Sequence, residues 1–356
     1  MRVALVMSDW ACSRPIDPQT LFTSPRGLTG SEISFHMMAR GLRKLGHDVT
    51  VFSNFTSSET VDDIPHRPMS DFPSAAGQAW DATATWIDPS PLRLVKSGKR
   101  LFNQQVNDFH YCPGWEGYVD VVTSPSDSHR RYLRSHTTFT GRWDVLPNGT
   151  DTERYSLKNR TGGGGKKLVY ASSPDRGLHW VLEAFPEIKR RVPQATLDVF
   201  YDWQGFYRNV RGGDTETSFR LRYCKEMFDR LRPHGVTHHG SASRDKMTQV
   251  FHDSRLLTYP CDTVSYTEGF SVTTLEAALS GCVPVIVDTD ALGEVYRGYV
   301  PVITSPYREH KREYIETVVE LLSDDATYER WQTSASRLSH LYNWDALCRI
   351  LVELLT

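Results

Sequence analysis

Short apolar segments alternate with amphipathic ones along this chain, and the alternation runs through it twice. In the first half, residues 3–7 and 49–52 read as strands, with an amphipathic helix predicted between them at residues 31–45. In the second half the same order returns, with a strand at 168–170 and a helix at 177–191. Alternating strands and helices predict parallel sheets with helices on both faces. We therefore predict an α/β chain with two such domains facing each other across a cleft, the usual place for a ligand.

A polar, glycine-rich stretch, residues 159–167, separates the two series and reads as a linker. We place the N-terminal domain at 1–155, the linker at 156–167 and the C-terminal domain at 168–335. The last helix, within 336–356, is expected to pack back on the first domain. Further strands are predicted at 83–87, 101–103, 119–124, 143–146, 196–201, 255–259 and 283–287, and further helices at 219–231, 244–253, 313–322 and 345–355.

Composition narrows the function classes. The net charge of −2 gives no basic footprint for nucleic acid, so no nucleic-acid partner is expected. No apolar run approaches the roughly 20 residues that span a bilayer, so no transmembrane segment is expected. The apolar start is too short for a signal peptide, and the six cysteines contain no CxxC pair. We expect reduced thiols and a cytoplasmic location, with a peripheral membrane contact left open.

Glu268 and Glu276 carry the strongest functional signal. Seven residues separate them, a helix start is predicted between them, and a buried strand follows at 283–287. A helix start presents free N–H groups and partial positive charge to an anion such as a diphosphate. Carboxylates suit sugar hydroxyls because each can accept several hydrogen bonds. The pattern therefore predicts a nucleotide-sugar site.

On these residues the chain resembles retaining glycosyltransferases of the GT-B fold, with two Rossmann-like domains, and most closely the large family 4. The glutamate pair matches the E-x7-E motif of that family. Residues 146–151 resemble the segment that leads into the second domain, and 172–178 resemble its first strand-to-helix turn. The loop at Gly30 resembles the part of the first domain that approaches the donor, and 343–345 resemble the segment before a closing helix.

The resemblance implies roles for matching positions. Glu276 would bind the ribose hydroxyls of the donor, and Glu268 would contact the sugar ring. Arg176 would neutralise the leaving diphosphate, which is electrostatic stabilisation of the transition state. The backbone N–H groups expected to hold the pyrophosphate are those of Phe270, Ser271 and Val272.

Two features depart from the family pattern. The strand end before the turn carries no Arg or Lys, so Ser172 and Ser173 would supply hydrogen bonds there, or a cation such as Arg244 or Lys246 would come from elsewhere. Ser271 also stands where a glycine is common, although its backbone N–H remains available.

The acceptor side rests on polar residues at strand ends of the first domain. Asp108 or His110, after the strand at 101–103, could position or deprotonate an acceptor hydroxyl. Asn107 in the same run and Asp88, after the strand at 83–87, are further candidates. These assignments stay open against one another.

Asp288-Thr289-Asp290 resembles the D-x-D metal motif of the other major glycosyltransferase fold, but it follows a strand in an ordinary strand-to-helix loop. Bound Mg²⁺ would need carboxylates aimed at the phosphates. A structural role, or a place on an acidic rim, is therefore expected for these residues. We expect no metal and no cofactor.

The expected activity is transfer of a hexose from a UDP- or GDP-linked donor to a hydroxyl acceptor, with retention. The acceptor would be a glycan, a lipid-linked sugar or a protein. No carboxylate pair of the retaining-glycosidase kind is evident, so no covalent intermediate is expected. A sugar-nucleotide epimerase, a phosphorylase and a non-catalytic nucleotide-sugar binding protein remain alternatives, because one fold supports several chemistries.

Overall fold

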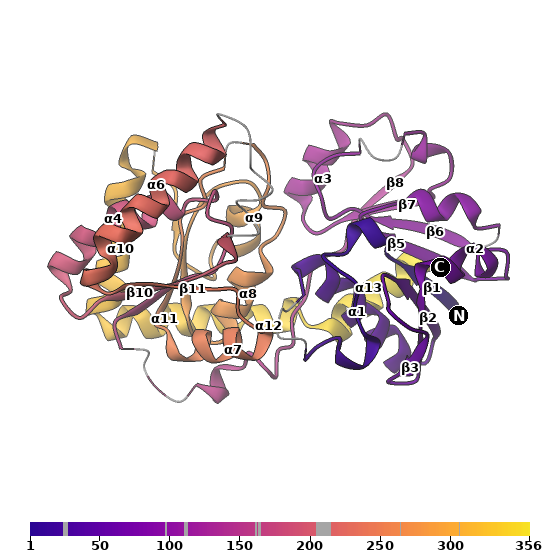
Figure 1. Cartoon of the computed structure of the whole chain (residues 1–356), viewed down its shortest axis with the longest axis horizontal. Coiled ribbons are helices and arrows are strands. Elements are labelled where there is room, and N and C mark those ends of the chain that lie inside the picture. Colours follow the sequence, from indigo (N-terminus) through magenta and orange to yellow (C-terminus); the bar gives the residue numbers. More distant parts are fainter. Residues whose placement is uncertain are drawn as a thin grey trace. The chain divides into compact units, whose positions relative to one another are not determined.

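The computed structural model describes most of the chain, and Figure 1 shows its helices and strands in order. The described residues are 1–23, 28–96, 98–109, 113–160, 162, 165–203, 215–263, 265–305 and 307–356.

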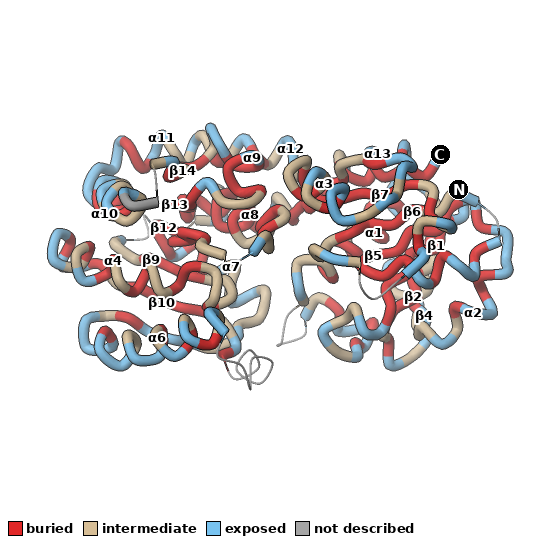
Figure 2. The backbone as a smooth tube through the Cα atoms, turned by 90° about the horizontal axis from the view of Figure 1, so that it is seen from above, coloured by how far each residue is buried: buried red, intermediate tan, exposed pale blue. Residues whose placement is uncertain are grey.

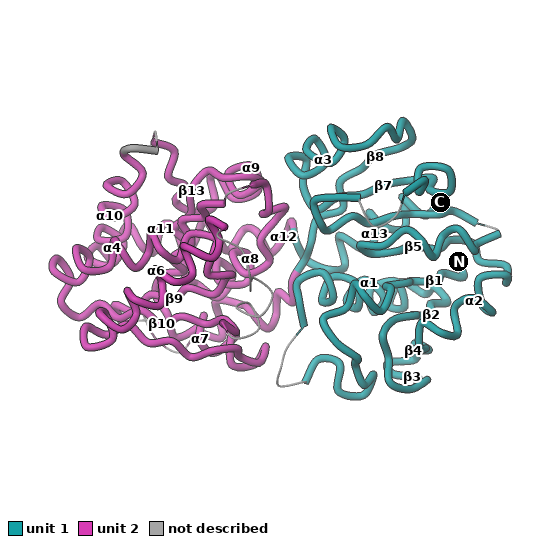
Figure 3. The backbone as a smooth tube through the Cα atoms, turned by 45° about the horizontal axis from the view of Figure 1, so that its top comes forward, with its two compact units in different colours: residues 1–149, 342–356 teal, residues 150–341 magenta. Residues whose placement is uncertain are grey.

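The chain forms two compact units (Figure 3). The first comprises Met1–Gly149 with Tyr342–Thr356, and the second is Thr150–Leu341. The second unit therefore starts before the predicted linker at 156–167. The side chains explain this, since Tyr155 is fully buried beside Phe251 and Arg160 donates to the backbone carbonyls of Phe251 and Ser280. Residues 150–160 thus pack as part of the second unit.

The first unit contains an eight-stranded sheet within its described residues, in the order β3-β4-β2-β1-β5-β6-β7-β8. Every neighbouring pair is parallel except β3 with β4. Its strands are β1 Arg2–Val6, β2 Asp48–Ser53, β3 Glu59–Val61, β4 Ile64–Pro68, β5 Ala82–Trp86, β6 Lys99–Asn103, β7 Val121–Ser124 and β8 Arg142–Val145. Its helices are α1 Gly30–Lys44, α2 Phe72–Ala75, α3 Asp127–Arg134 and α13 Trp344–Leu355.

Both faces of this sheet are covered, as β1 shows. Val3 and Leu5 belong to the apolar cluster shared with α1 and α13. Ala4 and Val6 belong to the cluster on the opposite face, shared with α2 and α3. Alternate strand residues point to opposite faces, so a strand buried on both reads as a continuous apolar run. Figure 2 shows β1 among the buried segments of the unit.

The last helix, α13, packs against α1 and β6 of the first unit. The contact is close at Gly41, where an added Cβ would lie 2.0 Å from Cys348 Sγ. Any larger residue at position 41 would push the two helices apart. The C-terminal helix is therefore a structural part of the unit that the start of the chain builds.

The second unit contains a six-stranded parallel sheet in the order β11-β10-β9-β12-β13-β14, within its described residues. In Figure 1, α4, α6 and α10 lie on one face of it, and α7, α8 and α11 on the other. The strands are β9 Lys167–Tyr170, β10 Thr196–Phe200, β11 Val236–Gly240, β12 Leu256–Tyr259, β13 Val283–Val287 and β14 Val302–Ile303. The helices are α4 Leu178–Arg191, α6 Glu216–Leu231, α7 Arg244–Asp253, α8 Val272–Leu279, α9 Leu292–Tyr296, α10 Tyr307–Ser323, α11 Asp325–Ser336 and α12 Leu338–Leu341.

No helix in the described ranges has the length and apolar character needed to cross a bilayer.

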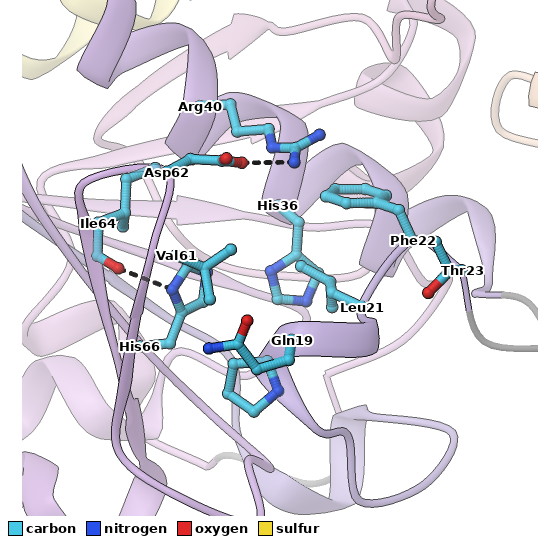
Figure 4. Close-up of a pocket in the computed structure, with 11 residues that line it drawn as sticks. Gln19, Leu21, Phe22, Thr23, His36, Arg40, Val61, Asp62, Ile64 and His66 are labelled. Atoms are coloured by element: carbon cyan, nitrogen blue, oxygen red, sulfur yellow. Dashed lines mark hydrogen bonds and ion pairs between the residues drawn. The ribbon is translucent and has the colours of Figure 1, made fainter.

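A cavity of about 120 Å³ lies in the first unit between α1, the β3–β4 hairpin and residues 18–23 (Figure 4). His36 of α1 lines it and is only 2% exposed. Among the described residues, neither ring nitrogen of His36 has a hydrogen-bond partner. Burial, and then the nearby His66 and Arg40, lower the pKa of His36 to about 3. The imidazole is therefore neutral in the folded protein.

A second buried histidine, His129 of α3, has a pKa lowered by burial to about 4. Both histidines have an ordinary pKa of 6.5, so between pH 6.5 and 4 the unfolded chain binds protons that the native state does not. As the pH drops through this range, each histidine should lower the free energy of unfolding by about 1.4 kcal/mol per pH unit. Urea midpoints at pH 7.5 and 5.0 measure this.

His36→Leu should weaken that pH dependence, whereas the exposed His234→Leu should leave it unchanged. An identical loss of stability at pH 5.0 in the wild type and His36→Leu would contradict the assignment.

Candidate functional site

The carboxyl ends of two neighbouring strands organise the polar residues of the second unit. β9 pairs in parallel with β12, so the loops that follow both strands leave the same edge of the sheet. The loop after β9 carries Arg176, and the loop after β12 carries Glu268 and leads into α8. Ligands of open α/β sheets bind outside such strand ends.

Glu268 is a buried carboxylate, 7% exposed, with two partners. Its Oε2 accepts a hydrogen bond of 2.5 Å from Tyr259 Oη and one of 3.2 Å from Arg176 Nη1. Burial, with nearby negative groups, holds the pKa of Tyr259 well above its usual value, so the phenol stays a donor. Arg176 thus pairs with Glu268 rather than with Asp175 or Glu183, the surface partners that a structural role would give it.

Asp290 fixes the loop that carries Glu268. Its Oδ2 accepts hydrogen bonds of 2.9 Å from the backbone N–H groups of Thr267 and Glu268. Asp288, the other acid of the D-x-D sequence, pairs with Arg297 at 2.5 Å. Both carboxylates therefore have structural contacts, as expected for a strand-to-helix loop. Within the described residues, no group of three or more His, Cys, Asp or Glu side chains could hold a metal ion.

The start of α8 has an unusual backbone. Ser271, its N-cap, has φ 70 and lies in the left-handed region that favours glycine. Its Oγ accepts from the N–H of Thr274 at 3.4 Å, and its carbonyl accepts from Tyr296 Oη at 2.7 Å. The Phe270 ring is buried beside Tyr296, so only the backbone of Phe270 can serve a ligand. The role of the backbone N–H groups of Phe270, Ser271 and Val272 toward a diphosphate stays a prediction.

Glu276, on α8, is 8% exposed and has different partners from Glu268. Thr150 Oγ1 donates to its Oε1 at 3.4 Å, and Arg244 Nη2 lies 3.6 Å from the same oxygen. Burial raises the pKa of Glu276, and Arg244 opposes that shift. Each glutamate of the pair therefore has its own arginine.

The loop after β9 is closely packed. Gly177 has φ +100, and an added Cβ would lie 2.1 Å from the carbonyl oxygen of Pro260 at the end of β12. Only glycine allows this approach, which brings Arg176 beside Glu268. The Ser173 hydroxyl donates to Asp175 within the loop, and the Ser173 carbonyl accepts from Tyr170 Oη. The structure describes Ser172 in the same turn, half-buried.

In the first unit, Asp88 is buried and accepts three hydrogen bonds. Ser8 Oγ donates to Oδ2 at 2.5 Å, Trp10 Nε1 to Oδ2 at 2.9 Å, and the backbone of Ser90 to Oδ1. The preceding Ile87 has φ 68, which is rare for a β-branched residue and signals strain. The carboxylate of Asp88 thus anchors the strand-end loops after β1 and β5.

The other candidates of the first unit each have a different kind of contact. Gly30 opens α1, where Thr29 and Glu32 form a capping box and Glu32 also accepts from Ser13. Asn107 Oδ1 lies 2.9 Å from Nε2 of the buried His129. The backbone carbonyl of Asp108 accepts from Gln104 Nε2 at 2.6 Å. His110 falls outside the described residues.

Several contact residues escaped the sequence analysis. From the sequence, Tyr259 is only part of a strand, Thr150 is only part of the segment that leads into the second domain, Tyr155 is only the last residue of the predicted first domain, and His129 carries no signal. The hydroxyl of Tyr259 at the end of a strand and that of Thr150 in a domain-crossing segment are the signals that could have marked these two residues.

Comparison with known proteins agrees with this architecture. Residues 165–324 match a family model described as glycosyl transferases group 1. The whole chain is similar in structure to sucrose-phosphate synthase from Thermosynechococcus elongatus, with a TM-score of 0.72, 13% identity, and coverage of 99% of this chain and 98% of that one. No match was found among curated protein sequences.

Two further structures carry nucleotides. The HepE protein of Anabaena, in complex with UDP and glucose, has a TM-score of 0.68 and 14% identity, and 99% of each chain is covered. The catalytic domain of starch synthase IV from Arabidopsis thaliana, bound to ADP and acarbose, has a TM-score of 0.70 and 10% identity, covering 99% of this chain and 98% of that one.

The whole chain therefore has the two-sheet fold of GT-B glycosyltransferase structures, and part of its second unit matches the glycosyl transferases group 1 model. The matched segment contains Arg176, Glu268 and Glu276, together with the start of α8.

The backbone of Ser271 gives a stability test. Ser271→Ala keeps the left-handed strain and loses the cap, which costs about 1 kcal/mol. Ser271→Gly relieves the strain and loses little capping, so its net effect should stay within about 0.5 kcal/mol. Thermal unfolding should then show a midpoint about 2–4 °C lower for the alanine variant than for wild type. Equal midpoints for Ser271→Ala and Ser271→Gly would contradict the assignment of backbone strain to Ser271.

Proposed function

We propose that this chain is a retaining hexosyltransferase that moves a sugar from a nucleotide diphosphate donor to a hydroxyl acceptor. The observation that carries the proposal is the contact of Arg176 with the buried Glu268, beside the start of α8. A cation, a carboxylate and free helix N–H groups are what a sugar diphosphate needs. The nucleotides named with the similar HepE and starch synthase structures support the same donor class.

The donor half of the reaction follows from these groups. The bond between the anomeric carbon and the phosphate oxygen breaks, and its electron pair goes to the diphosphate. The N–H groups of Phe270, Ser271 and Val272 and the guanidinium of Arg176 stabilise the charge that develops there. The guanidinium has five N–H donors, so a bond to Glu268 leaves others for phosphate.

Glu268 would hold the sugar. Within the described residues, both hydrogen bonds to its carboxylate use Oε2, so Oε1 can accept a ring hydroxyl. A negative charge near the ring also favours the positive, oxocarbenium-like character that the sugar gains. The acceptor oxygen then bonds to the anomeric carbon on the face that the diphosphate left. Its proton passes to a base, for which Asp108 and His110 of the first unit are the candidates.

We propose that no metal is essential. Arg176 and the helix start would supply the positive charge that Mg²⁺ gives to other sites. Asp288 and Asp290 already hold Arg297 and the backbone of the Glu268 loop. A sugar-nucleotide epimerase on the same fold is the main alternative, and it would turn over donor without any acceptor.

Thermal shift tests the donor site. UDP, GDP and ADP and their sugar conjugates are each added to the wild type and to Glu276→Ala, with and without EDTA. A ligand that binds only the native state raises the midpoint. We expect a shift with one nucleotide family that EDTA does not change and that Glu276→Ala weakens. No shift with any nucleotide would contradict a donor site, and a shift abolished by EDTA would contradict metal independence.

Kinetics test the two central residues. Glu268→Gln keeps the size of the side chain but removes its charge, and Arg176→Met removes the cation. Each should lower kcat about 10²–10³-fold, because both act on charge that develops in the transition state. The rate of nucleotide release measures this once the donor is known, and the anomeric configuration of the product, read by NMR, tests retention.

The matched control is Glu183→Gln, since Glu183 pairs with Lys311 and not with Arg176. An unchanged kcat in Glu268→Gln, or release of nucleotide at the wild-type rate without any acceptor, would contradict the transferase mechanism.

A further inference from the structure

The surroundings of Glu276 differ from those of an ordinary surface carboxylate. The side chain is buried on α8, and its neighbours come from two other segments of the second unit. Thr150 and Tyr155 belong to the segment that enters the unit, and Arg244 opens α7. A buried carboxylate without a partner takes up a proton, so these neighbours decide its charge.

Arg244 is held in place from one side. Its side chain is 11% exposed, its Nε donates to Tyr155 Oη at 3.4 Å, and the guanidinium carbon lies 5.8 Å from the centre of the Tyr155 ring. Tyr155 itself is fully buried, and burial raises its pKa, so its hydroxyl remains protonated. The ring therefore fixes the guanidinium at the edge of Glu276.

The Nη2 group of Arg244 lacks a hydrogen bond within the described residues. Nη2 is buried and, in the described part of the chain, makes no hydrogen bond, although it lies 3.6 Å from Glu276 Oε1. A buried donor without an acceptor costs free energy, so its retention here calls for an explanation. A small movement of the carboxylate toward Arg244 would complete this hydrogen bond, and catalytic hydrogen bonds often tighten only when a ligand binds.

We propose that Arg244 is a positioning residue for donor recognition: with Tyr155, it holds Glu276 as an oriented carboxylate that accepts hydrogen bonds from the ribose hydroxyls of the nucleotide. This inference rests on the proposed donor site. Arg244 touches Glu276 rather than the donor, so it acts through the glutamate.

The charge of Glu276 matters because of the hydrogen bonds that a ribose diol makes. The two hydroxyls donate, and a carboxylate offers two accepting oxygens, whereas a protonated acid replaces one acceptor with a donor. Burial raises the pKa of Glu276, while Arg244 first, then Tyr155, Thr150 and Arg154, lower it. Asp151 also acts on Arg244, because its negative charge raises the pKa of the guanidinium. Arg244 is thus the group that most opposes the rise in the pKa of Glu276 that burial causes.

The experiment measures nucleotide affinity by calorimetry for wild type, Arg244→Met, Arg244→Lys and Tyr155→Phe. The probes are UDP, GDP and ADP and their 2′-deoxy forms dUDP, dGDP and dADP, each from pH 6.0 to 8.5. Removal of the 2′-hydroxyl from the nucleotide that binds best should weaken binding to the wild type about tenfold or more, as expected for a hydrogen bond to a charged group.

Arg244→Met should bind the ribose and deoxyribose forms with nearly equal affinity at pH 6.0. Its affinity for the ribose form should recover as pH rises, because Glu276 loses its proton there. The midpoint of this recovery should lie at higher pH than the corresponding midpoint in wild type. Arg244→Lys should restore part of the discrimination, and Tyr155→Phe should give an intermediate loss.

Lys225→Met is the matched control, because it removes an exposed positive charge from α6, another helix of the same unit. Full discrimination in Arg244→Met would overturn the proposal. An equal loss of affinity for both forms at every pH would also overturn it, since that pattern means general damage to the unit, which the thermal midpoint of the variant reports independently. Failure of the wild type to bind any of the nucleotides would instead contradict the donor site itself.

Discussion

The parallel pairing of β9 with β12 is the constraint on which the candidate site depends. Because both strands run in the same direction, the loops that follow them leave one edge of the sheet together. Gly177 then lets the first loop reach the Pro260 carbonyl at the end of the second, and Arg176 meets Glu268 there. No single segment of the chain contains this contact. Strand order creates it, and the glycine sets its distance.

The buried carboxylates of Glu268, before α8, and Glu276, within α8, have different surroundings. Glu268 takes a phenol and an arginine from strand-end positions, whereas Glu276 takes a threonine from the entering segment and an arginine from α7. A charge taken out of water needs a partner, and separate partners allow the two acids to be tuned independently. The two glutamates therefore share neither a proton nor a cation across the start of α8.

The sequence predicted what apolar periodicity and motif spacing can carry. β13 has the predicted bounds, because a run buried on both faces is continuous in sequence. The hairpin β3–β4 and the edge strand β11 were not predicted, since they are short and largely polar. In the site, the helix start between the glutamates was predicted, but Tyr259 and Arg244 have no spacing that ties them to their partners. Such contacts arise from packing, which a single sequence does not record.

The docking of α13 at Gly41 has a consequence for synthesis of the chain. The first unit is discontinuous, since Met1–Gly149 is completed only by Tyr342–Thr356, whereas Thr150–Leu341 is continuous. As the chain leaves the ribosome, the apolar residues of α1 and β6 that receive α13 stay uncovered until residues 342–356 emerge. The second unit can close first, although it comes later in the sequence. A nascent chain would then hold an unfinished first unit, with these apolar residues open to chaperones, until α13 is available.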